Sequence, residues 1–321
     1  MSAVDAIAAP PDPLVSSARS LFVDAVTAEV VAALGARGVR ALLLKGPVLA
    51  RLLYEGYEQR PYVDSDLLVA PGARARAECV LGGLGFEPLA FDRRDLLGHR
   101  PHAEPWGRRS DRGLVDLHST LSGIDAPPAE VWCTLAAATI PTRVGTVEVE
   151  ALAPAGVALV VALHAAHHGA RASKPAEDLA RAVERVVPEV WREAAELASR
   201  LGATGAFATG LRTQPRGAVL AAELGLPPTG SVEARLRARG APTTAFGLER
   251  LAGTPGVRGK LAVLAAEAVP SVRFMRYSSR VARGGRLGLL AAYLWRTPSL
   301  ALRAPSALRA WRGARTVTRG R

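Results

Sequence analysis

Two aspartates separated by a single residue, Asp64 and Asp66, lie in the apolar stretch 63–70, VDSDLLVA. The Leu and Val residues predict a strand, in which alternate side chains share a face, so the two carboxylates would lie side by side. Adjacent carboxylates raise each other's pKa unless a cation lies between them. Oxygen ligands of this kind suit hard cations, Mg²⁺ above all. The spacing therefore predicts a divalent-cation site, although one D-x-D pair among 11 aspartates also arises by chance.

A third carboxylate, Asp116, lies in another apolar stretch, 114–118, LVDLH. An acidic side chain between Val and Leu is costly to bury without a partner. Period-two alternation places Asp116 and His118 on the same face of the predicted strand. If this strand lies beside the strand over 63–70, Asp116 completes a cluster of three carboxylates, with His118 at its rim. Taken alone, Asp116 is also compatible with an aspartate satisfied at a strand end.

A lysine and a glycine, Lys45 and Gly46, stand where a predicted strand gives way to a predicted helix. Backbone N–H groups and the helix dipole at such a turn point toward an anion, which makes it a common place to bind phosphate. Lys45 adds a positive charge suited to the same ligand. An ordinary strand-to-helix turn has the same sequence, so this pair is a weak signal by itself.

The elements that would position these residues follow from hydrophobic periodicity and from glycine and proline. The pattern predicts a helix ending near Gly35 or Gly38, a strand over 39–45, a helix from Pro47 to 54, strands over 63–70, 85–91 and 112–121, a helix over 72–84, and a hairpin or edge strand over 143–152. From Pro154 to about residue 270 the pattern is helical, with breaks at Gly169, Pro188, Gly202 and Pro227-Pro228. We therefore expect an α+β protein with three parts: a small α/β domain over 1–150 that carries the candidate residues, a mostly helical domain over 151–270, and a basic C-terminal helix and tail over 271–321.

Three segments together, LLLKGPVLARLLY (42–54), RPYVDSDLLV (60–69) and VDLH (115–118), resemble the uncharacterised nucleotidyltransferase family of the DNA polymerase beta-like superfamily. Members of that superfamily have a glycine turn after the first strand, then a helix, a D-x-D strand, and a third acidic residue on a later strand. The likeness extends over residues 20 to 210, because the two-histidine helix and the Asp-Leu-Ala segment of 158–183 also resemble the family.

The resemblance implies that Asp64, Asp66 and Asp116 form the catalytic, metal-binding carboxylate cluster. It places Gly46 at the phosphate turn and makes Lys45 and Arg60 candidate triphosphate contacts, with His118 beside them. One departure is Pro47, which stands where many superfamily members have serine and offers neither a hydroxyl nor an N–H.

The implied activity is transfer of a nucleoside monophosphate from a nucleoside triphosphate to an acceptor, with Mg²⁺ or Mn²⁺ as cofactor and release of pyrophosphate. The acceptor is open: a sugar, a small metabolite, a peptide, a protein side chain or an RNA end. One alternative is a non-catalytic relative that binds nucleotide as a regulator. Another is a D-x-D glycosyltransferase, which would normally have a longer nucleotide-binding half before the motif and does not explain Asp116.

Three histidines, His164, His167 and His168, share one face of the predicted helix in 158–183. They form either a separate metal site, a helix face packed beside the active site, or part of the core. We expect the helix to cover the open face of the α/β unit, with His164 and His168 within about 20 Å of Asp64.

Four further polar residues are assigned by their surroundings. Lys174 and Asp178 follow on the same predicted surface as the three histidines, whereas His99 and His102 stand in a polar stretch that predicts a solvated loop or an edge strand. The two cysteines give neither a disulfide framework nor zinc-ligand spacing. No secretion signal is seen, which predicts a cytoplasmic protein.

The net charge of +12 is confined to one end of the chain. Segment 268–321 has 12 arginines and no Asp or Glu, whereas residues 1–267 hold 29 basic and 29 acidic residues. With 38 arginines and three lysines overall, a GC-rich gene also explains part of the basic composition. Such polarity is found in proteins that contact nucleic acid or an anionic membrane surface, so weak contact of the C-terminal tail with a polyanion or a membrane surface is one interpretation, although the scarcity of aromatic residues disfavours it. The alternative is a packed helix over 271–296 followed by a solvated tail.

Overall fold

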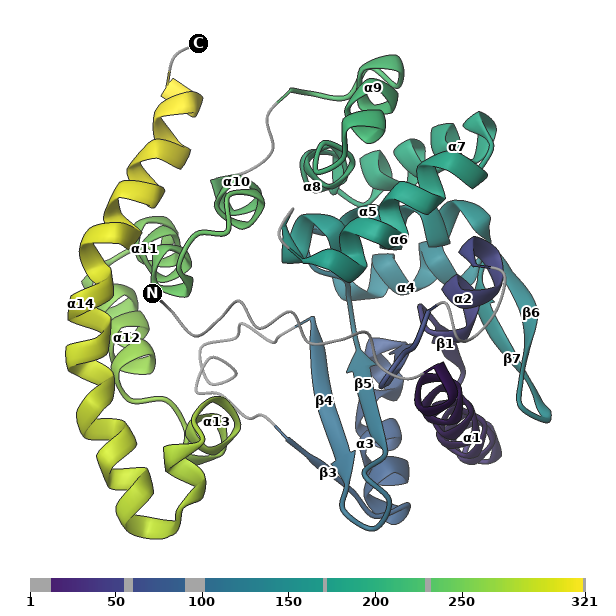
Figure 1. Ribbon diagram of the computed structural model, residues 1–321, viewed down its shortest axis with the longest axis horizontal. Coiled ribbons are helices and arrows are strands. Elements are labelled where there is room, and N and C mark those ends of the chain that lie inside the picture. The colour runs from purple at the N-terminus through teal and green to yellow at the C-terminus, as the bar shows by residue number, and fades with distance from the viewer. Residues whose placement is uncertain (1–12, 55–59, 90–101, 170–171, 229–231, 320–321) are drawn as a thin grey trace.

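The computed structural model describes residues 13–54, 60–89, 102–169, 172–228 and 232–319. A seven-stranded sheet with the order β3-β4-β5-β2-β1-β7-β6 organises the N-terminal half (Figure 1). Its strands are β1 (Ala41–Leu43), β2 (Ser65–Val69), β3 (Phe86–Pro88), β4 (Ala103–Arg108), β5 (Leu114–His118), β6 (Thr139–Val144) and β7 (Val147–Leu152). The helices of this half are α1 (Pro13–Ala36), α2 (Pro47–Leu53), α3 (Arg74–Gly83) and α4 (Pro128–Ala136), with a 3₁₀ turn at Pro71–Ala73. The expected α+β fold class, a small α/β unit followed by helices, is confirmed.

Strand β2 lies in the middle of the sheet, where it pairs with β1 in the antiparallel sense and with β5 in the parallel sense. All five of its residues are buried, as expected for a strand covered on both faces. Helix α1 packs against β1, β2, β5, β6 and β7. The strand that carries the aspartate motif is therefore held by neighbours on both edges.

The predicted elements of the α/β unit agree with the structure except around β4 and α4. The polar sequence of β4, AEPWGR, contains proline and glycine and gives little strand signal, but β3 and β5 pair with it on both sides. We expected only a charged turn before residue 112. The hairpin predicted over 143–152 is β6–β7; only β6 is at the sheet edge, because β7 pairs with β1.

The chain after Pro154 is helical, as predicted. The helices are α5 (Pro154–His168), α6 (Ser173–Arg185), α7 (Pro188–Arg200), α8 (Thr204–Leu211), α9 (Pro215–Glu223), α10 (Val232–Ala238), α11 (Thr243–Gly253), α12 (Val257–Ala268), α13 (Val272–Ser278) and α14 (Gly285–Arg319). One hydrophobic core runs from Val26 in α1 through the sheet to Ala221 in α9. The division near residue 150 stays a prediction, and this core extends across it.

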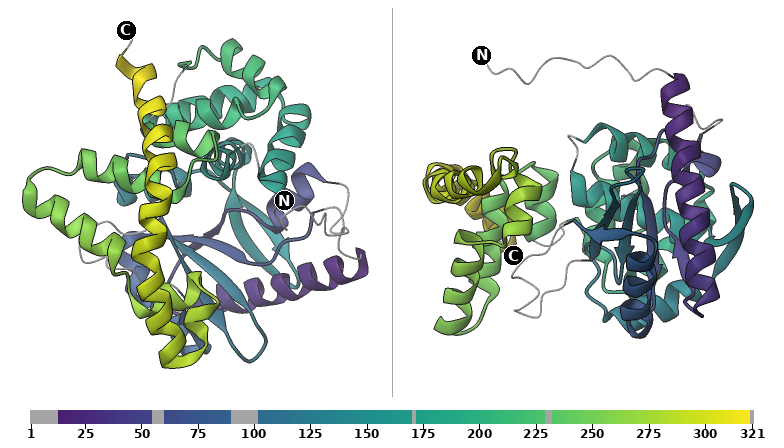
Figure 2. Two further views of the ribbon diagram at one scale, coloured as in Figure 1. Left: turned by 60° about the vertical axis from the view of Figure 1, so that its left-hand side comes forward. Right: turned by 90° about the horizontal axis from the view of Figure 1, so that it is seen from below.

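Helices α11 to α14 form a separate layer beside this body, with α14 along its outer edge (Figures 1 and 2). Helix α10 contacts both α5 and α8 and links the two parts. The layer has small cores of its own, one of which contains Leu236, Ala245, Ala307 and Ala314. The segment after residue 296, expected as a solvated tail, is instead helical: α14 extends over 35 residues, from Gly285 through two prolines to Arg319. In the described part of the chain, no helix combines the length and hydropathy needed to cross a membrane.

Candidate active site

Asp66 and Asp116 face each other across the β2–β5 pair. The parallel register aligns the two residues directly, and it also aligns the buried Leu67 with the buried Leu117. Because side chains alternate along a strand, this register fixes both carboxylates on the same side of the sheet. Asp64 immediately precedes β2. The sheet therefore brings together the three predicted carboxylates.

Asp66 is the most enclosed of the three, with 3% of its surface exposed. Its Oδ1 lies 2.8 Å from Lys45 Nζ and 3.1 Å from His118 Nε2. Burial by itself would raise the pKa of Asp66, but the Lys45 ammonium and the bond with His118 outweigh it and hold that pKa well below its usual range. The same attraction raises the pKa of Lys45 against the opposing effect of burial. Asp66 is thus held ionised by two residues of the predicted site.

Asp64 and Asp116 have the opposite electrostatics. Both are half-buried, and among the described residues neither has a hydrogen-bond or ion-pair partner. Burial and the nearby charge of Asp66 raise the pKa of Asp64. Burial, with the charges of Asp66 and Asp64, raises the pKa of Asp116 to about 6. Two carboxylates without a partner beside an ionised third make a group of oxygen atoms that could hold a cation.

Gly46 forms the turn from β1 into α2 with a φ of 67°, a region that L side chains rarely adopt. A Cβ at this position would lie 3.6 Å from the Tyr62 ring and 3.9 Å from the carbonyl oxygen of Asp64. The turn therefore lies against the backbone of the aspartate motif. Pro47 begins α2 and removes one N–H from the helix start.

Arg60 lies in a buried ion pair with Asp178 of α6. Its Nε and a terminal nitrogen each donate to one carboxylate oxygen at 2.7 Å. The Tyr54 hydroxyl donates to the same carboxylate at 2.8 Å. Burial opposes the charge on Arg60, but the hydrogen bonds and the charge of Asp178 raise the pKa of Arg60. Two of its three guanidinium nitrogens therefore bind a carboxylate that lies 118 residues further along the chain.

A cavity of about 330 Å³ opens beside the carboxylates. Histidines supply much of its wall: His102, His118, His164, His167 and His168 line it together with Lys45, Asp66 and Asp116. Burial, then the charge of Lys45, lowers the pKa of His164 well below its ordinary value. The predicted histidine face of α5 therefore lies next to the carboxylates. Among the described residues, the group whose ligand atoms converge for a metal is Asp66, Asp116 and His118, within 4.8 Å of one another.

Sequence reasoning missed two residues of this cavity. His102 was expected in a solvated loop or at an edge, but it is half-buried, with its ring centroid 5.9 Å from that of His118 and 5.1 Å from that of His167. Ser122 was not singled out, yet its Oγ lies 2.8 Å from Nδ1 of His167. The start of β4, for which the sequence gave little signal, brings His102 here. The predicted His99 lies outside the described residues.

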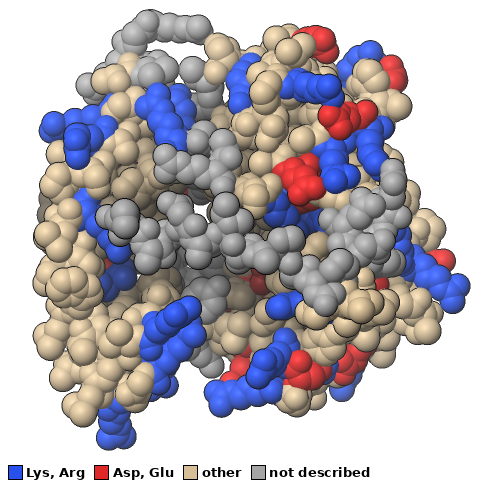
Figure 3. All heavy atoms as spheres, viewed as in Figure 1, with Lys and Arg blue, Asp and Glu red and all other residues tan. Residues whose placement is uncertain are grey.

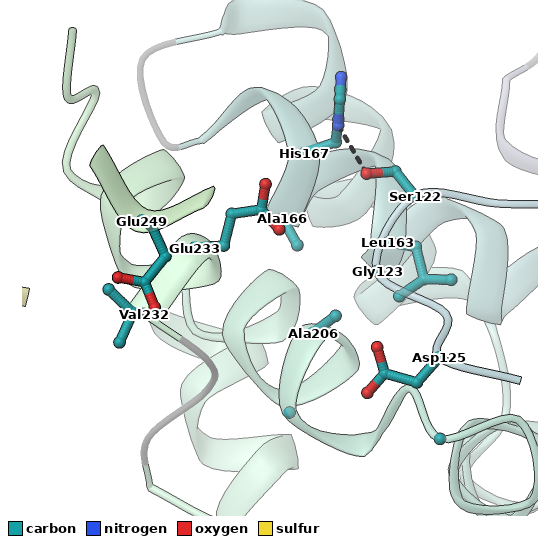
Figure 4. Close-up of a pocket in the computed structure, with 12 residues that line it drawn as sticks. Ser122, Gly123, Asp125, Leu163, Ala166, His167, Ala206, Val232, Glu233 and Glu249 are labelled. Carbon is teal, nitrogen blue, oxygen red and sulfur yellow. Dashed lines mark hydrogen bonds between the residues drawn. The ribbon is translucent and has the colours of Figure 1, made fainter. Parts of the chain in front are cut away.

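Two further cavities adjoin the first. One of about 420 Å³ shares Ser122 and His167 with it, and the carboxylates of Asp125, Glu233 and Glu249 lie on its walls (Figure 4). The other, of about 1000 Å³, lies beneath α14 and also includes His167 in its wall. His167 thus borders all three spaces, from the carboxylates to the C-terminal helices.

Lys174, at the start of α6, contacts the segment 60–64, which leads into β2 and which we call the motif loop. Its Nζ donates to the carbonyl oxygen of Pro61 at 2.5 Å. Burial, and then the charge of Arg60, lowers the pKa of Lys174. Together with Asp178 it fixes α6 to the motif loop. The sequence placed Lys174 and Asp178 on the same surface as the three histidines but did not predict these contacts.

Known proteins resemble this chain to different degrees. Among solved structures, antibiotic-resistance factor ANT(2'')-Ia is 15% identical, with a TM-score of 0.39 over 59% of this chain and 95% of that one. An antigenic nucleotidyltransferase-like protein from Paracoccidioides brasiliensis is 15% identical, with a TM-score of 0.35 over 56% and 92%. A search of curated proteins finds no match. The model of the family described as uncharacterised nucleotidyltransferase matches residues 15–215, most of the chain and all of its carboxylate site, so this protein belongs to the uncharacterised nucleotidyltransferase family.

Proposed function

We propose that this protein transfers a nucleoside monophosphate from a nucleoside triphosphate to an acceptor hydroxyl and depends on a divalent cation. The observation that carries the proposal is the alignment of Asp66 with Asp116 across β2 and β5, with Asp64 beside them. Family membership supports the reaction class. The alternative of a D-x-D glycosyltransferase has no comparable support.

The residues present fit Mg²⁺ or Mn²⁺. Asp64 and Asp116 are carboxylates without a counter-charge of their own, and Asp66 keeps one oxygen free of the Lys45 and His118 contacts. Oxygen donors in this number suit a hard cation. We assign Asp64, Asp66 and Asp116 as the residues that would hold it. When bound, such an ion would neutralise triphosphate charge and make the acceptor hydroxyl more acidic.

The chain's own residues have separate parts in the proposed reaction. Lys45 and the Gly46 turn are placed to meet the phosphates once nucleotide competes with Asp66 for the ammonium. The acceptor oxygen bonds to the α-phosphorus, the bond from that phosphorus to the β-phosphate oxygen breaks, and pyrophosphate leaves. Asp116 takes the acceptor proton as general base. His118 orients Asp66 through their hydrogen bond.

Lys45 and Arg60, the two candidate triphosphate contacts, have different roles in this proposal. Lys45 is within reach of the site, whereas Arg60 binds Asp178 through two of its nitrogens. As a triphosphate contact, Arg60 has only its remaining nitrogen to offer. We propose that Arg60 chiefly positions the motif by joining its loop to α6.

The three adjoining cavities provide room for an acceptor. The Ser122–His167 pair stands between the carboxylates and the larger spaces. In the space beneath α14, Thr244 Oγ1 and Arg250 Nε are buried and have no hydrogen-bond partner among the described residues. Buried polar atoms of this kind are rare and call for a ligand or water. We propose that the acceptor enters by this path.

Radiolabelled nucleotide tests the proposal directly. The full-length protein is incubated with cell extract, Mg²⁺ and a nucleoside triphosphate labelled either at the α- or at the γ-phosphorus. Transfer of the α label, with release of the γ label in pyrophosphate, is the expected result. Transfer of the γ label would indicate a kinase and overturn the proposal.

Matched variants complete the test. Asp116→Asn should lower labelling by about a thousandfold, whereas Glu148→Gln, which removes an exposed acidic charge on β7, should leave it unchanged. Nucleotide binding without any labelled product across sugars, peptides and RNA ends would favour the non-catalytic regulatory relative instead. Labelling that persists in EDTA would contradict the metal requirement.

A further inference from the structure

Helix α14 has apolar residues on two opposite faces. The inner face packs into the C-terminal layer through Ala292 and Ala307, among others. The outer face presents Leu287, Leu290 and Leu294, which are 82%, 56% and 68% exposed. A helix that is apolar on opposite faces needs a second apolar environment to cover the exposed one.

The outer face is an uninterrupted apolar stripe. Positions at three- or four-residue spacing from Leu287 are 287, 290, 294, 298, 301, 305 and 308, and they hold only leucine, proline and alanine. These positions lie on one side of a helix, and at 1.5 Å per residue the stripe is about 30 Å long. Leu302 borders it at 73% exposure and Trp295 at 65%.

This concentration of exposed apolar side chains is particular to the C-terminal layer. Of the 19 large apolar side chains exposed in the described part of the chain, 11 lie between Val257 and Leu302. Helix α14 forms the outer edge of the layer, away from the sheet (Figures 1 and 2). The stripe therefore faces outward rather than into the gap beside the body.

The charge around the stripe is of one sign. Segment 268–321 has 12 arginines and no acidic residue. Arg309 and Arg312 are exposed, and helical periodicity places them on the same face, directly after the stripe. The acidic side chains visible in Figure 3 gather mainly over the α/β body, on the right. An apolar stripe continued by arginines matches a surface that is apolar inside and anionic outside.

We infer that the outer face of α14 binds an anionic membrane surface peripherally. The leucines enter the boundary between headgroups and acyl chains, Trp295 lies at the same level, and the arginines bind lipid phosphates. A second copy of this chain fits poorly, because two segments of charge +12 would repel each other. RNA fits poorly because it does not cover leucine side chains. This inference is independent of the proposed catalytic activity.

Vesicle co-sedimentation of the full-length protein tests it. The vesicles are pure phosphatidylcholine, or phosphatidylcholine with about one third phosphatidylglycerol. Binding to the anionic vesicles is expected at low salt, together with little binding to the neutral ones. The paired substitution Leu290→Gln with Leu294→Gln should weaken that binding at least about tenfold, from the apolar area that no longer enters the membrane.

Two matched controls separate the contribution of the exposed leucines to vesicle binding from that of the arginines. Leu21→Gln changes an equally exposed leucine of α1, at 60%, and should leave vesicle binding unchanged. Arg309→Gln with Arg312→Gln should weaken binding several-fold and make it less dependent on salt. The control pair Arg19→Gln with Arg37→Gln changes two exposed arginines, one in α1 and one directly after it, and should have neither effect. Circular dichroism checks that each variant is folded.

Two results would overturn the inference. One is equal sedimentation of wild type and the leucine double variant with anionic vesicles. The other is salt-sensitive binding to single-stranded RNA with no binding to vesicles of either kind.

Discussion

The α/β body and the C-terminal layer are both mostly alanine, leucine and valine inside, yet they are held together in different ways. The body shares one core from Val26 to Ala221 and buries charged groups in pairs, such as Arg60 with Asp178. The layer has small cores rich in alanine and leaves large apolar side chains exposed. The body is therefore arranged to fix a few side chains accurately, and the layer to present a surface.

The largest effect should come from cutting the chain within the body. A chain that ends after residue 152 lacks α5 to α9 and uncovers the apolar side chains that they bury, so we expect it to aggregate. A chain that ends after residue 228 keeps the whole of that core and should unfold cooperatively in a thermal melt followed by circular dichroism. A folded, soluble 1–152 fragment would instead support an independent catalytic domain ending near residue 150.

The next effect separates two carboxylates of the same site. Asp66→Asn and Asp116→Asn should each lower transfer by about a thousandfold, at the upper end of losses seen when a charge-stabilising group is removed. Their stabilities should differ, because Asp66→Asn leaves the enclosed Lys45 without its partner and should cost about 3–5 kcal/mol. Asp116→Asn removes a repelled charge and should not destabilise the metal-free protein. Urea unfolding without Mg²⁺ measures both; equal losses would contradict the different surroundings described for the two side chains.

Buried and exposed ion pairs provide a third contrast. Arg60→Gln leaves Asp178 buried without its counter-charge and should cost about 3–5 kcal/mol of unfolding free energy. Arg216→Gln breaks an exposed pair with Glu184, at 75% and 52% side-chain exposure, and should change stability by less than about 1 kcal/mol. Denaturant titration compares the two variants. A similar loss in both would show that Arg60 does not join the motif loop to α6 in solution.

The smallest expected effect on the body comes from the layer. Leu236→Ala removes a fully buried side chain of the α10–α14 core and should cost about 2–5 kcal/mol locally. Amide hydrogen exchange should quicken in α11 and α14, while protection of β2 and β5 stays unchanged. Leu211→Ala, in the core of the body, is the matched control and should quicken exchange in the strands as well. Loss of strand protection in Leu236→Ala would mean that the two parts unfold together.

Many of the helix and strand boundaries could be predicted from local sequence. Pro47 marks the start of α2 and Gly169 the end of α5, because both residues act on the backbone where they stand. Strand β4 could not be predicted from its own sequence, since this polar segment forms a strand only by pairing with β3 and β5. The spacing of Asp64 and Asp66 is local, and Asp116 joined them as a candidate because it stands in a predicted strand and in the family pattern.

The contacts within the site were harder to predict. The pairing of Arg60 with Asp178 joins residues 118 positions apart. The sequence around either residue gives no indication of its partner. The Lys45 contact with Asp66 depends in the same way on the β1–β2 register. His102 reaches the cavity only because β4 forms. Motif spacing thus predicted the family and the candidate carboxylates, whereas tertiary pairing decides which of the neighbouring side chains have a partner within the protein.

The parallel pairing of β1 with β7 also has a consequence for synthesis of the chain. It joins Leu42 to Glu150, 108 positions apart. At 5–20 residues per second, the ribosome needs roughly 5–20 s to make that stretch. During this interval the three leucines at 42–44 have no neighbour on one edge of the nascent sheet. We expect this to be the time at which the emerging chain is most exposed to aggregation and most accessible to chaperones.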